Sequence, residues 1–156
     1  MLNELQKDGV FASYAIGGAM AATFYTEPFL TFDLAVFVAL PQTPGGLLTL
    51  AALRARGYSE LENECIQIEG VPVRFLPAYN TLLEEALKEA QEIMYEDVRA
   101  RVLRSEHLVA ICLQTGRRKD RERIRILREQ AELDQNFLAD VLRRHQLEDK
   151  WKLWTE

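Results

Sequence analysis

Hydrophobic residues in the first half of the chain fall into short continuous runs separated by small or amphipathic segments, which predicts strands alternating with helices. A run at 14–16 stops at a Gly-Gly pair, and a longer run at 34–40 has the length and composition of a buried strand. Two shorter runs, 65–69 and 71–76, flank Gly70 and predict a tight hairpin. The segments between the runs predict helices at 3–12, 19–25 and 47–56, the last of which is ended by Gly57.

Apolar residues in the second half recur mostly at helical spacing. Thr81 and Glu84 have the spacing of a capping box that opens a helix at 82–92. Ser105 and Asp134 are residue types that cap helix N-termini. The predicted helices that follow cover 106–115, which ends at Gly116, then 118–133, and then the segment from Asp134 to about 145.

These elements predict a single α+β domain over residues 1–156, with a small mixed sheet flanked by helices in about 1–80 and a mainly helical C-terminal lobe in about 81–156. A chain of 156 residues that is 48% hydrophobic buries its own core, which excludes a disordered chain and a collagen-like repeat. No apolar run approaches the roughly 20 residues that span a bilayer, and the first residues lack a basic region followed by an apolar one. We therefore expect a cytoplasmic protein without a membrane partner.

Cysteine and histidine usage excludes two further classes of site. Cys65 and Cys112 are too few and too far apart for a disulfide framework, and they predict two reduced, buried thiols. His107 and His145 have no neighbouring Cys or His at the spacing of zinc ligands. We therefore expect no zinc chemistry.

The formal net charge of −5 conceals a basic segment at 99–128, which has ten Lys or Arg, three acids and a charge of +7. Such a segment either attracts phosphates or forms a solvated helix face with long basic side chains. Trp151 and Trp154 are predicted to pack the C-terminal tail onto the domain instead of binding a base. Four arginines of the basic segment share one helix face, for which a solvated stripe is favoured over an RNA or triphosphate contact: Arg117, Arg121, Arg125 and Arg128.

Candidate chemistry begins at Gly17-Gly18, between the predicted strand at 14–16 and the helix that follows it. A Gly-Gly turn lets backbone N–H groups approach a phosphate, and a helix N-terminus adds positive potential. Asp33 stands at the start of the next strand, at the rim of the sheet, where a carboxylate can hold a divalent cation. Each feature also has a structural interpretation, a strand-to-helix turn for the glycines and an end cap for Asp33.

Together these features resemble the nucleotidyltransferase superfamily, in particular its minimal bacterial members and the related abortive-infection toxins. The family pattern is a strand, Gly-Gly or Gly-Ser, a helix, and then Thr-x-Asp-x-Asp opening a strand; Gly17-Gly18, Thr31 and Asp33 match it in this order. The resemblance extends over about 14–127. It includes Glu27-Pro28, the strand and its exit at 71–80, and Gly116-Arg117-Arg118-Lys119-Asp120, which resembles the Gly-Arg-x-Lys-Asp signature between the C-terminal helices of the family.

The sequence departs from that pattern at its carboxylates. The second metal-binding Asp falls on Ala35, and the Arg that commonly follows Glu-Pro falls on Phe29. The strand at 71–76 has no acid for the third carboxylate and carries Arg74 near the expected place. Two-metal phosphoryl transfer needs carboxylates that bridge both cations. A guanidinium cannot take a proton at neutral pH, although it can hold a phosphate.

The resemblance implies a cleft for a nucleoside triphosphate (NTP), with Mg²⁺ held at Asp33. The implied reaction transfers a nucleoside monophosphate to RNA, a protein or a small molecule, and the missing carboxylates imply that the reaction is impaired or absent. The alternative is a non-catalytic interaction module, for example one that binds a small partner protein in a toxin–antitoxin-like pair. Lys119 and Asp120 can instead be an exposed pair of side chains at a helix start without a catalytic role, where the helix dipole favours Asp120. The candidate catalytic residues are Asp33, Lys119 and Asp120, and the candidate nucleotide-binding residues are Gly17, Gly18, Thr31 and Arg74.

Overall fold

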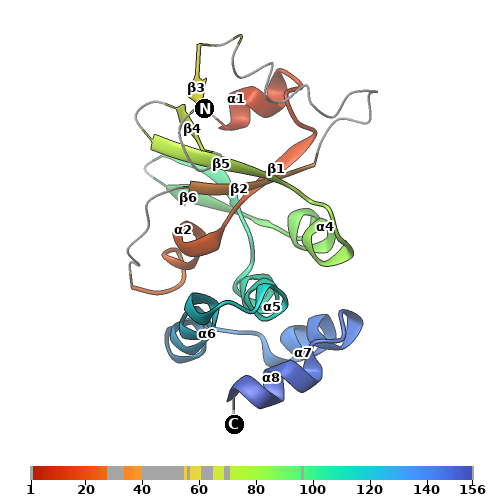
Figure 1. The fold of residues 1–156 in the computed structure, drawn as a ribbon. Coiled ribbons are helices and arrows are strands. Elements are labelled where there is room, and N and C mark those ends of the chain that lie inside the picture. The colour runs from red at the N-terminus through yellow and green to blue at the C-terminus, as the bar shows by residue number, and fades with distance from the viewer. Residues whose placement is uncertain are drawn as a thin grey trace.

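A computed structural model of the chain describes residues 2–27, 34–39, 55, 57–60, 65–68, 71–95 and 97–155. Within these ranges, seven strands form one mixed sheet and seven helices accompany it (Figure 1). The predicted α+β class is therefore confirmed. Thr31, Asp33 and, apart from Ala55, the predicted helix at 47–56 lie outside the described residues.

The sheet is built around β2, which lies between β1 and β5. β1 runs antiparallel to β2, and β5 runs parallel to it. Val36, Phe37 and Val38 are all buried, so both faces of β2 are covered; this explains why its sequence is continuously apolar and does not alternate. The strand order is β3-β4-β5-β2-β1-β7-β6. The strands are β1 (Ser13–Gly17), β2 (Leu34–Ala39), β3 (Ser59–Glu60), β4 (Ile66–Ile68), β5 (Val71–Pro77), β6 (Gln91–Tyr95) and β7 (Val98–Val102).

The helices lie in layers on the sheet (Figure 1). α1 packs against β1, whereas α2 and α4 lie between the sheet and the last four helices, which we call the C-terminal lobe. None of the helices in the described ranges is long and apolar enough to cross a membrane. The helices are α1 (Leu2–Lys7), α2 (Gly18–Ala22), α4 (Thr81–Lys88), α5 (Ser105–Thr115), α6 (Arg118–Gln130), α7 (Gln135–Arg144) and α8 (Glu148–Thr155).

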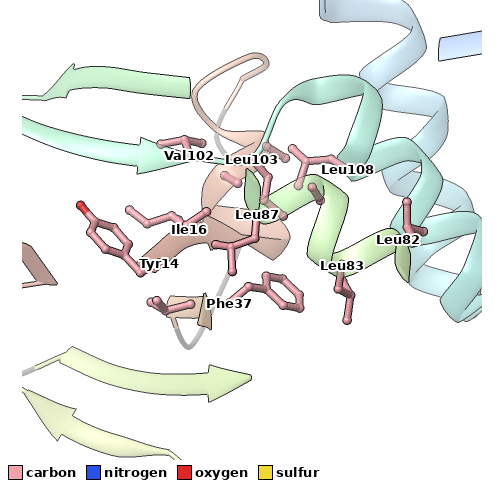
Figure 2. Packing of buried hydrophobic residues seen from close by; sticks show 14 of the residues in the cluster. Tyr14, Ile16, Phe37, Leu82, Leu83, Leu87, Val102, Leu103 and Leu108 are labelled. Atoms are coloured by element: carbon pink, nitrogen blue, oxygen red, sulfur yellow. The ribbon is translucent and has the colours of Figure 1, made fainter. Parts of the chain in front are cut away.

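The main hydrophobic core lies between the sheet and the helices α4 and α5. Ile16 and Phe37 of the central strands belong to the same cluster of buried residues as Leu83 and Leu87 of α4 (Figure 2). Burial of each large apolar side chain contributes about 1.5–3 kcal/mol, and this term holds α4 on the sheet. Tyr14 is also buried, and its hydroxyl donates a hydrogen bond to Asn3 at 2.7 Å, which satisfies its polar atom inside the core.

A polar cluster joins α4 to α5 and α7. Glu85 accepts hydrogen bonds from Nε2 of His107 at 2.7 Å and from Nε of Arg144 at 2.9 Å, and Nε2 of His145 lies 3.3 Å from the same carboxylate. Burial raises the pKa of Glu85, but hydrogen bonds from Arg144, His107 and His145 outweigh it and lower the pKa to about 2. Burial lowers the pKa of His107 below 6.5, against the opposing effect of Glu85. The ionised carboxylate of Glu85 and the neutral, fully buried imidazole of His107 therefore hold the C-terminal lobe against α4.

The helix predicted at 82–92 is shorter than expected, because α4 ends at Lys88. Its cap also differs from the predicted Thr81 capping box. Oδ1 of Asn80 accepts a hydrogen bond from the amide of Leu83 at 2.9 Å, so Thr81 is the first helical residue. Asn satisfies the free N–H groups of a first turn at least as well as Thr does, and the adjacent Asn80 supplies the cap.

The half that was expected to be mainly helical also contains β6 and β7, which pair as an antiparallel hairpin at the edge of the sheet. Ile93 and Ala100 pair across the hairpin and pack against the core, whereas Met94 is exposed. Asp97 takes up a φ of 68° in the turn, a conformation that Asp tolerates better than most residues. Pairing of β7 with β1 stabilises the hairpin, and this contact between distant parts of the chain leaves no local sequence signal.

Other helix boundaries agree with the sequence pattern in part. Asp134 caps α7 by accepting a hydrogen bond from the amide of Phe137 at 3.0 Å, and Gly116 ends α5 with a φ of 70°; both predictions are confirmed. Ser105 is the first residue of α5 and not its cap, since the N-cap position belongs to Arg104. The Ser105 hydroxyl donates to the carboxylate of Glu106 instead.

Candidate functional site

A cleft of about 280 Å³ opens beside α2, between the sheet and the C-terminal lobe. Ala35 of β2 and Arg74 of β5 line it from the sheet, next to Gly18 at the start of α2. Lys119 and Asp120 line it from α6. We call this the central cleft; it brings together four of the residues singled out from the sequence, namely Gly18, Arg74, Lys119 and Asp120.

Gly17 and Gly18 are each required to be glycine for a different steric reason. Gly17 is buried in β1, and a Cβ there would lie 2.4 Å from Cε2 of Phe37. Gly18 has a φ of +62°, and a Cβ there would lie 3.2 Å from the Cβ of Ala35. α2 spans only five residues, so few peptide dipoles are aligned at its N-terminus. The fold thus accounts for the Gly-Gly pair, and the short helix adds little positive potential.

Strand pairing places Arg74 beside Ala35. In the parallel register of β2 with β5, Ala35 is paired with Arg74, and on the other side Ala35 is paired with Gly17. Directly paired residues point to the same face of a sheet, and both Ala35 and Arg74 line the central cleft. Ala35, on which the second Asp of the pattern falls, and Arg74, which is near the place expected for the third carboxylate, are therefore adjacent.

Asp120 is only 1% exposed and is bound by arginines of its own helix start. Its carboxylate accepts hydrogen bonds from the backbone amide of Arg117 at 3.1 Å and from Nε of Arg117 at 2.8 Å. Nη1 of Arg123 lies 3.7 Å away. The bond from the Arg117 amide to the Asp120 carboxylate is one half of a capping box, so the acid satisfies one free N–H group at the start of α6. Lys119, in contrast, is exposed and lines the cleft, which leaves its ammonium group accessible to an anion.

Cys112 lies on the cleft wall close to Asp120. Burial and the neighbouring charge of Asp120 raise the pKa of this thiol to about 12. A thiol of this kind stays protonated at neutral pH and is a poor nucleophile. Cys65 and Cys112 are both buried and neither is in a disulfide, as the sequence predicted.

Tyr79 is a residue of the cleft that the sequence pattern did not single out. It follows β5, lines the central cleft and is 80% exposed, which is unusual for a large aromatic side chain. Leu76, Leu83 and Ile111 line the same cleft. The cleft therefore has an apolar and aromatic portion as well as a cationic one. The position of Tyr79 at the exit of a strand that matches the family pattern was the one signal for it in the sequence.

Two arginines of the predicted stripe on α6 are engaged in ion pairs. Arg117 binds Asp120, as described above. Arg125 pairs with Glu129 at 2.8 Å and also with Glu122. These hydrogen bonds raise the pKa of Arg125 further, so its charge is permanent.

The other two arginines of the stripe lie over the tryptophans of α8. The guanidinium of Arg121 is 5.6 Å from the ring centroid of Trp154, and that of Arg128 is 5.5 Å from the ring centroid of Trp151. Both tryptophans are partly buried and pack against the core, which confirms the prediction that they hold the C-terminal tail. These contacts favour the solvated-stripe interpretation over an RNA contact.

The described residues do not supply a donor set for a metal ion. They contain no group of three or more His, Cys, Asp or Glu side chains that could coordinate one. Asp120 is the one carboxylate among the described residues that line the cleft, and it is bound by Arg117. Mg²⁺ prefers carboxylate and phosphate oxygens and is repelled by a guanidinium. The described part of the site therefore fits an anion and not a cation.

No protein-family model matches the sequence, and no curated protein matches it either. Solved structures do share its fold. The crystal structure of ANT(2")-Ia in complex with adenylyl-2"-tobramycin has a TM-score of 0.54 and 14% identity, and the match covers 96% of this chain and 94% of that one. An antigenic nucleotidyltransferase-like protein from Paracoccidioides brasiliensis also has a TM-score of 0.54 and 14% identity, over 81% of this chain and 69% of that one. The chain therefore has a nucleotidyltransferase fold, as predicted.

Proposed function

We propose that this protein is a member of the nucleotidyltransferase superfamily that binds an NTP in the central cleft and is impaired or inactive in nucleotidyl transfer. One observation carries the proposal: Arg74 stands beside Ala35, in the same cleft as Lys119. In a catalytic member of the superfamily, the region around Ala35 and Arg74 would hold metal ions; in this protein it would bind an anion. The nucleotidyltransferase fold supports the choice of an NTP as the anion.

Each group of the cleft has a role in this proposal. Arg74 and Lys119 neutralise the phosphates, Arg74 with the planar donor fork that suits phosphate oxygens. The Gly18 backbone approaches the phosphates closely because it has no side chain. Tyr79 provides a flat surface on which a base can stack, beside the apolar side chains of Leu76 and Leu83.

Transfer of the nucleotide requires more than binding. When bound, Mg²⁺ would stabilise the charge that develops on the phosphoryl oxygens. Asp33 is the candidate ligand from the sequence, but Ala35 offers no lone pair and Arg74 cannot act as a base. Loss of one metal ligand removes several kcal/mol of transition-state stabilisation, which is on the order of a thousandfold or more in rate.

The acceptor remains a prediction from the resemblance: RNA, a protein or a small molecule. The structural neighbour ANT(2")-Ia was solved with adenylyl-2"-tobramycin, which makes a small molecule one of the acceptors worth testing here. The role as a non-catalytic component of a toxin–antitoxin-like pair also stays a prediction.

Two measurements test the proposal. Calorimetric titration with each of the four NTPs, with and without Mg²⁺, should show binding; no heat and no thermal shift at millimolar nucleotide would contradict the binding role. Incubation with labelled NTPs, Mg²⁺ or Mn²⁺ and cell RNA or protein should show no readily detected label transfer. Robust metal-dependent transfer that Asp33→Ala abolishes would contradict the loss of activity.

A further inference from the structure

Two side-chain amides meet beside Tyr79, the exposed aromatic residue of the central cleft. Nδ2 of Asn80 donates a hydrogen bond to Oε1 of Gln114 at 2.9 Å. Asn80 directly follows Tyr79 in the chain, and Gln114, near the end of α5, lines the cleft together with Tyr79. A polar side chain of the cleft is therefore joined to the residue next to the aromatic ring on which we expect a base to stack.

The cap of α4 fixes which way these two amides point. Oδ1 of Asn80 accepts a hydrogen bond from the backbone N–H of Leu83 at 2.9 Å, and a backbone N–H can only donate. The oxygen of Asn80 therefore belongs to the cap, and the end of its amide that meets Gln114 is the NH₂ group, which also can only donate. Gln114 must answer that donor with its own oxygen, so Nε2 is the end of the Gln114 amide that Asn80 does not hold.

We propose that Gln114 reads the edge of the base of the bound NTP and selects a base with a keto oxygen over a base with an amino group. This inference rests on the proposed NTP-binding function and names the class of nucleotide. Guanine and uracil carry an exocyclic oxygen where adenine and cytosine carry an NH₂ group. Nε2 of Gln114 donates to that oxygen, whereas an NH₂ group of the base offers it no acceptor. Asn80 is a positioning residue, because it acts on the base only through Gln114.

Calorimetric titration of the whole chain with each of the four NTPs in one buffer tests this selection. We expect GTP and UTP to bind about tenfold more tightly than ATP and CTP, which is the effect of one well-made hydrogen bond. Equal affinity for all four NTPs, or tighter binding of ATP and CTP, would overturn the inference and leave the proposed NTP-binding function intact. Absence of binding by every NTP would overturn the proposed function itself.

Asn80→Asp tests the orientation of the Gln114 amide. A carboxylate at position 80 still caps α4, but it offers Gln114 an acceptor in place of a donor. The Gln114 amide should then turn over and present its oxygen to the base, and the preference should reverse toward ATP and CTP. Gln114→Glu keeps an oxygen for Asn80 and loses both N–H groups, so it should also lose the preference for GTP and UTP.

Asn136→Asp is the matched control for the added charge. Asn136 is exposed on α7, outside the lining of the central cleft, so this variant should keep the order of the four NTPs. The four NTPs carry the same phosphates, and the order within one variant therefore does not depend on the added charge. Thermal unfolding verifies that each variant folds. If Asn80→Asp and Gln114→Glu fold and still prefer GTP and UTP, the inference is overturned.

Discussion

Arg74 of β5 and Ala35 of β2 are direct neighbours across a parallel strand pair, and both face the central cleft. Gly17 is paired with Ala35 from the opposite strand, so the glycine turn, the alanine and the arginine form one row across the centre of the sheet. The second Asp of the nucleotidyltransferase pattern falls on Ala35, and Arg74 is near the place expected for its third carboxylate. Here the one charge that the described residues contribute to the row is positive, which is the basis for proposing binding without efficient chemistry.

Restoring carboxylates should restore metal binding before it restores turnover. Ala35→Asp places a carboxylate beside the guanidinium of Arg74, and we expect tighter Mg²⁺ binding with little nucleotidyl transfer, because the strand at 71–76 has no acid to activate the acceptor. The double variant Ala35→Asp/Arg74→Asp should show measurable transfer in a labelled-NTP assay. Transfer by the single variant at the level of the double variant would show that a second acid is not needed.

The exposed aromatic ring of Tyr79 should contribute to nucleotide affinity through stacking. Tyr79→Ala should weaken ATP binding by about 1–3 kcal/mol, the usual range for one base stacked on an aromatic side chain. Tripolyphosphate has no base, so its affinity should not change, and Tyr79→Phe should behave like the unchanged protein. An equal loss for ATP and tripolyphosphate would place Tyr79 at the phosphates and not at the base.

Gly17 should tolerate no side chain, although its backbone conformation is an ordinary one. Its φ is −126°, but an added Cβ would lie 2.4 Å from the ring of Phe37, so Gly17→Ala should destabilise the fold by about 1–3 kcal/mol through overpacking. Gly9→Ala is the control: it has open space but a φ of +78°, and it should cost only about 1 kcal/mol. Urea unfolding measures both. Phe37→Leu in the Gly17→Ala background should recover part of the loss if the clash is the cause.

Stability should fall as the solution becomes acidic, in two stages. The folded pKa of His107 is lowered below 6.5, so below that pH the unfolded chain binds a proton that the folded chain refuses, and stability is lost. The folded pKa of Glu85 is about 2 against an ordinary 4.5, so its contribution is present above 4.5 and is lost as the pH falls from 4.5 to 2.

Urea unfolding midpoints across this pH range test the two stages. His107→Gln should flatten the upper stage between about pH 7 and pH 5 and leave the lower one in place. An unchanged slope between these pH values in His107→Gln would show that another group causes the upper stage.

Substitution of the two arginines that lie over the tryptophans should lower the stability of the fold and should leave RNA binding unchanged. Arg121→Gln/Arg128→Gln removes two cation–π contacts with Trp154 and Trp151, each worth about 0.5–1 kcal/mol at an exposed site. Thermal unfolding should register this loss. An affinity of the unchanged protein for cell RNA that falls steeply with salt, and a smaller salt slope in the double variant, would instead assign the stripe to a nucleic acid.

Local chemistry in the sequence determined several parts of this structure. The apolar run at 34–40 had to be a covered strand, Asp134 had to cap a helix and Gly116 had to end one, because each depends on interactions within a few residues. The resemblance to the nucleotidyltransferase pattern, carried by Gly17-Gly18, Thr31, Asp33 and the segment at 116–120, was enough to predict the fold. The lack of carboxylates at Ala35 and along β5 is likewise a property of the sequence alone.

Tertiary structure decided the rest. The β6–β7 hairpin exists because β7 pairs with β1, and no local pattern encodes a partner so far away in the sequence. The burial of Asp120 and the position of Tyr79 at the cleft are also results of tertiary structure. Most of all, only strand register could place Arg74 next to Ala35. Hydrogen bonding between strands joins residues that are remote along the chain, and this contact places Arg74 on the wall of the cleft beside Ala35.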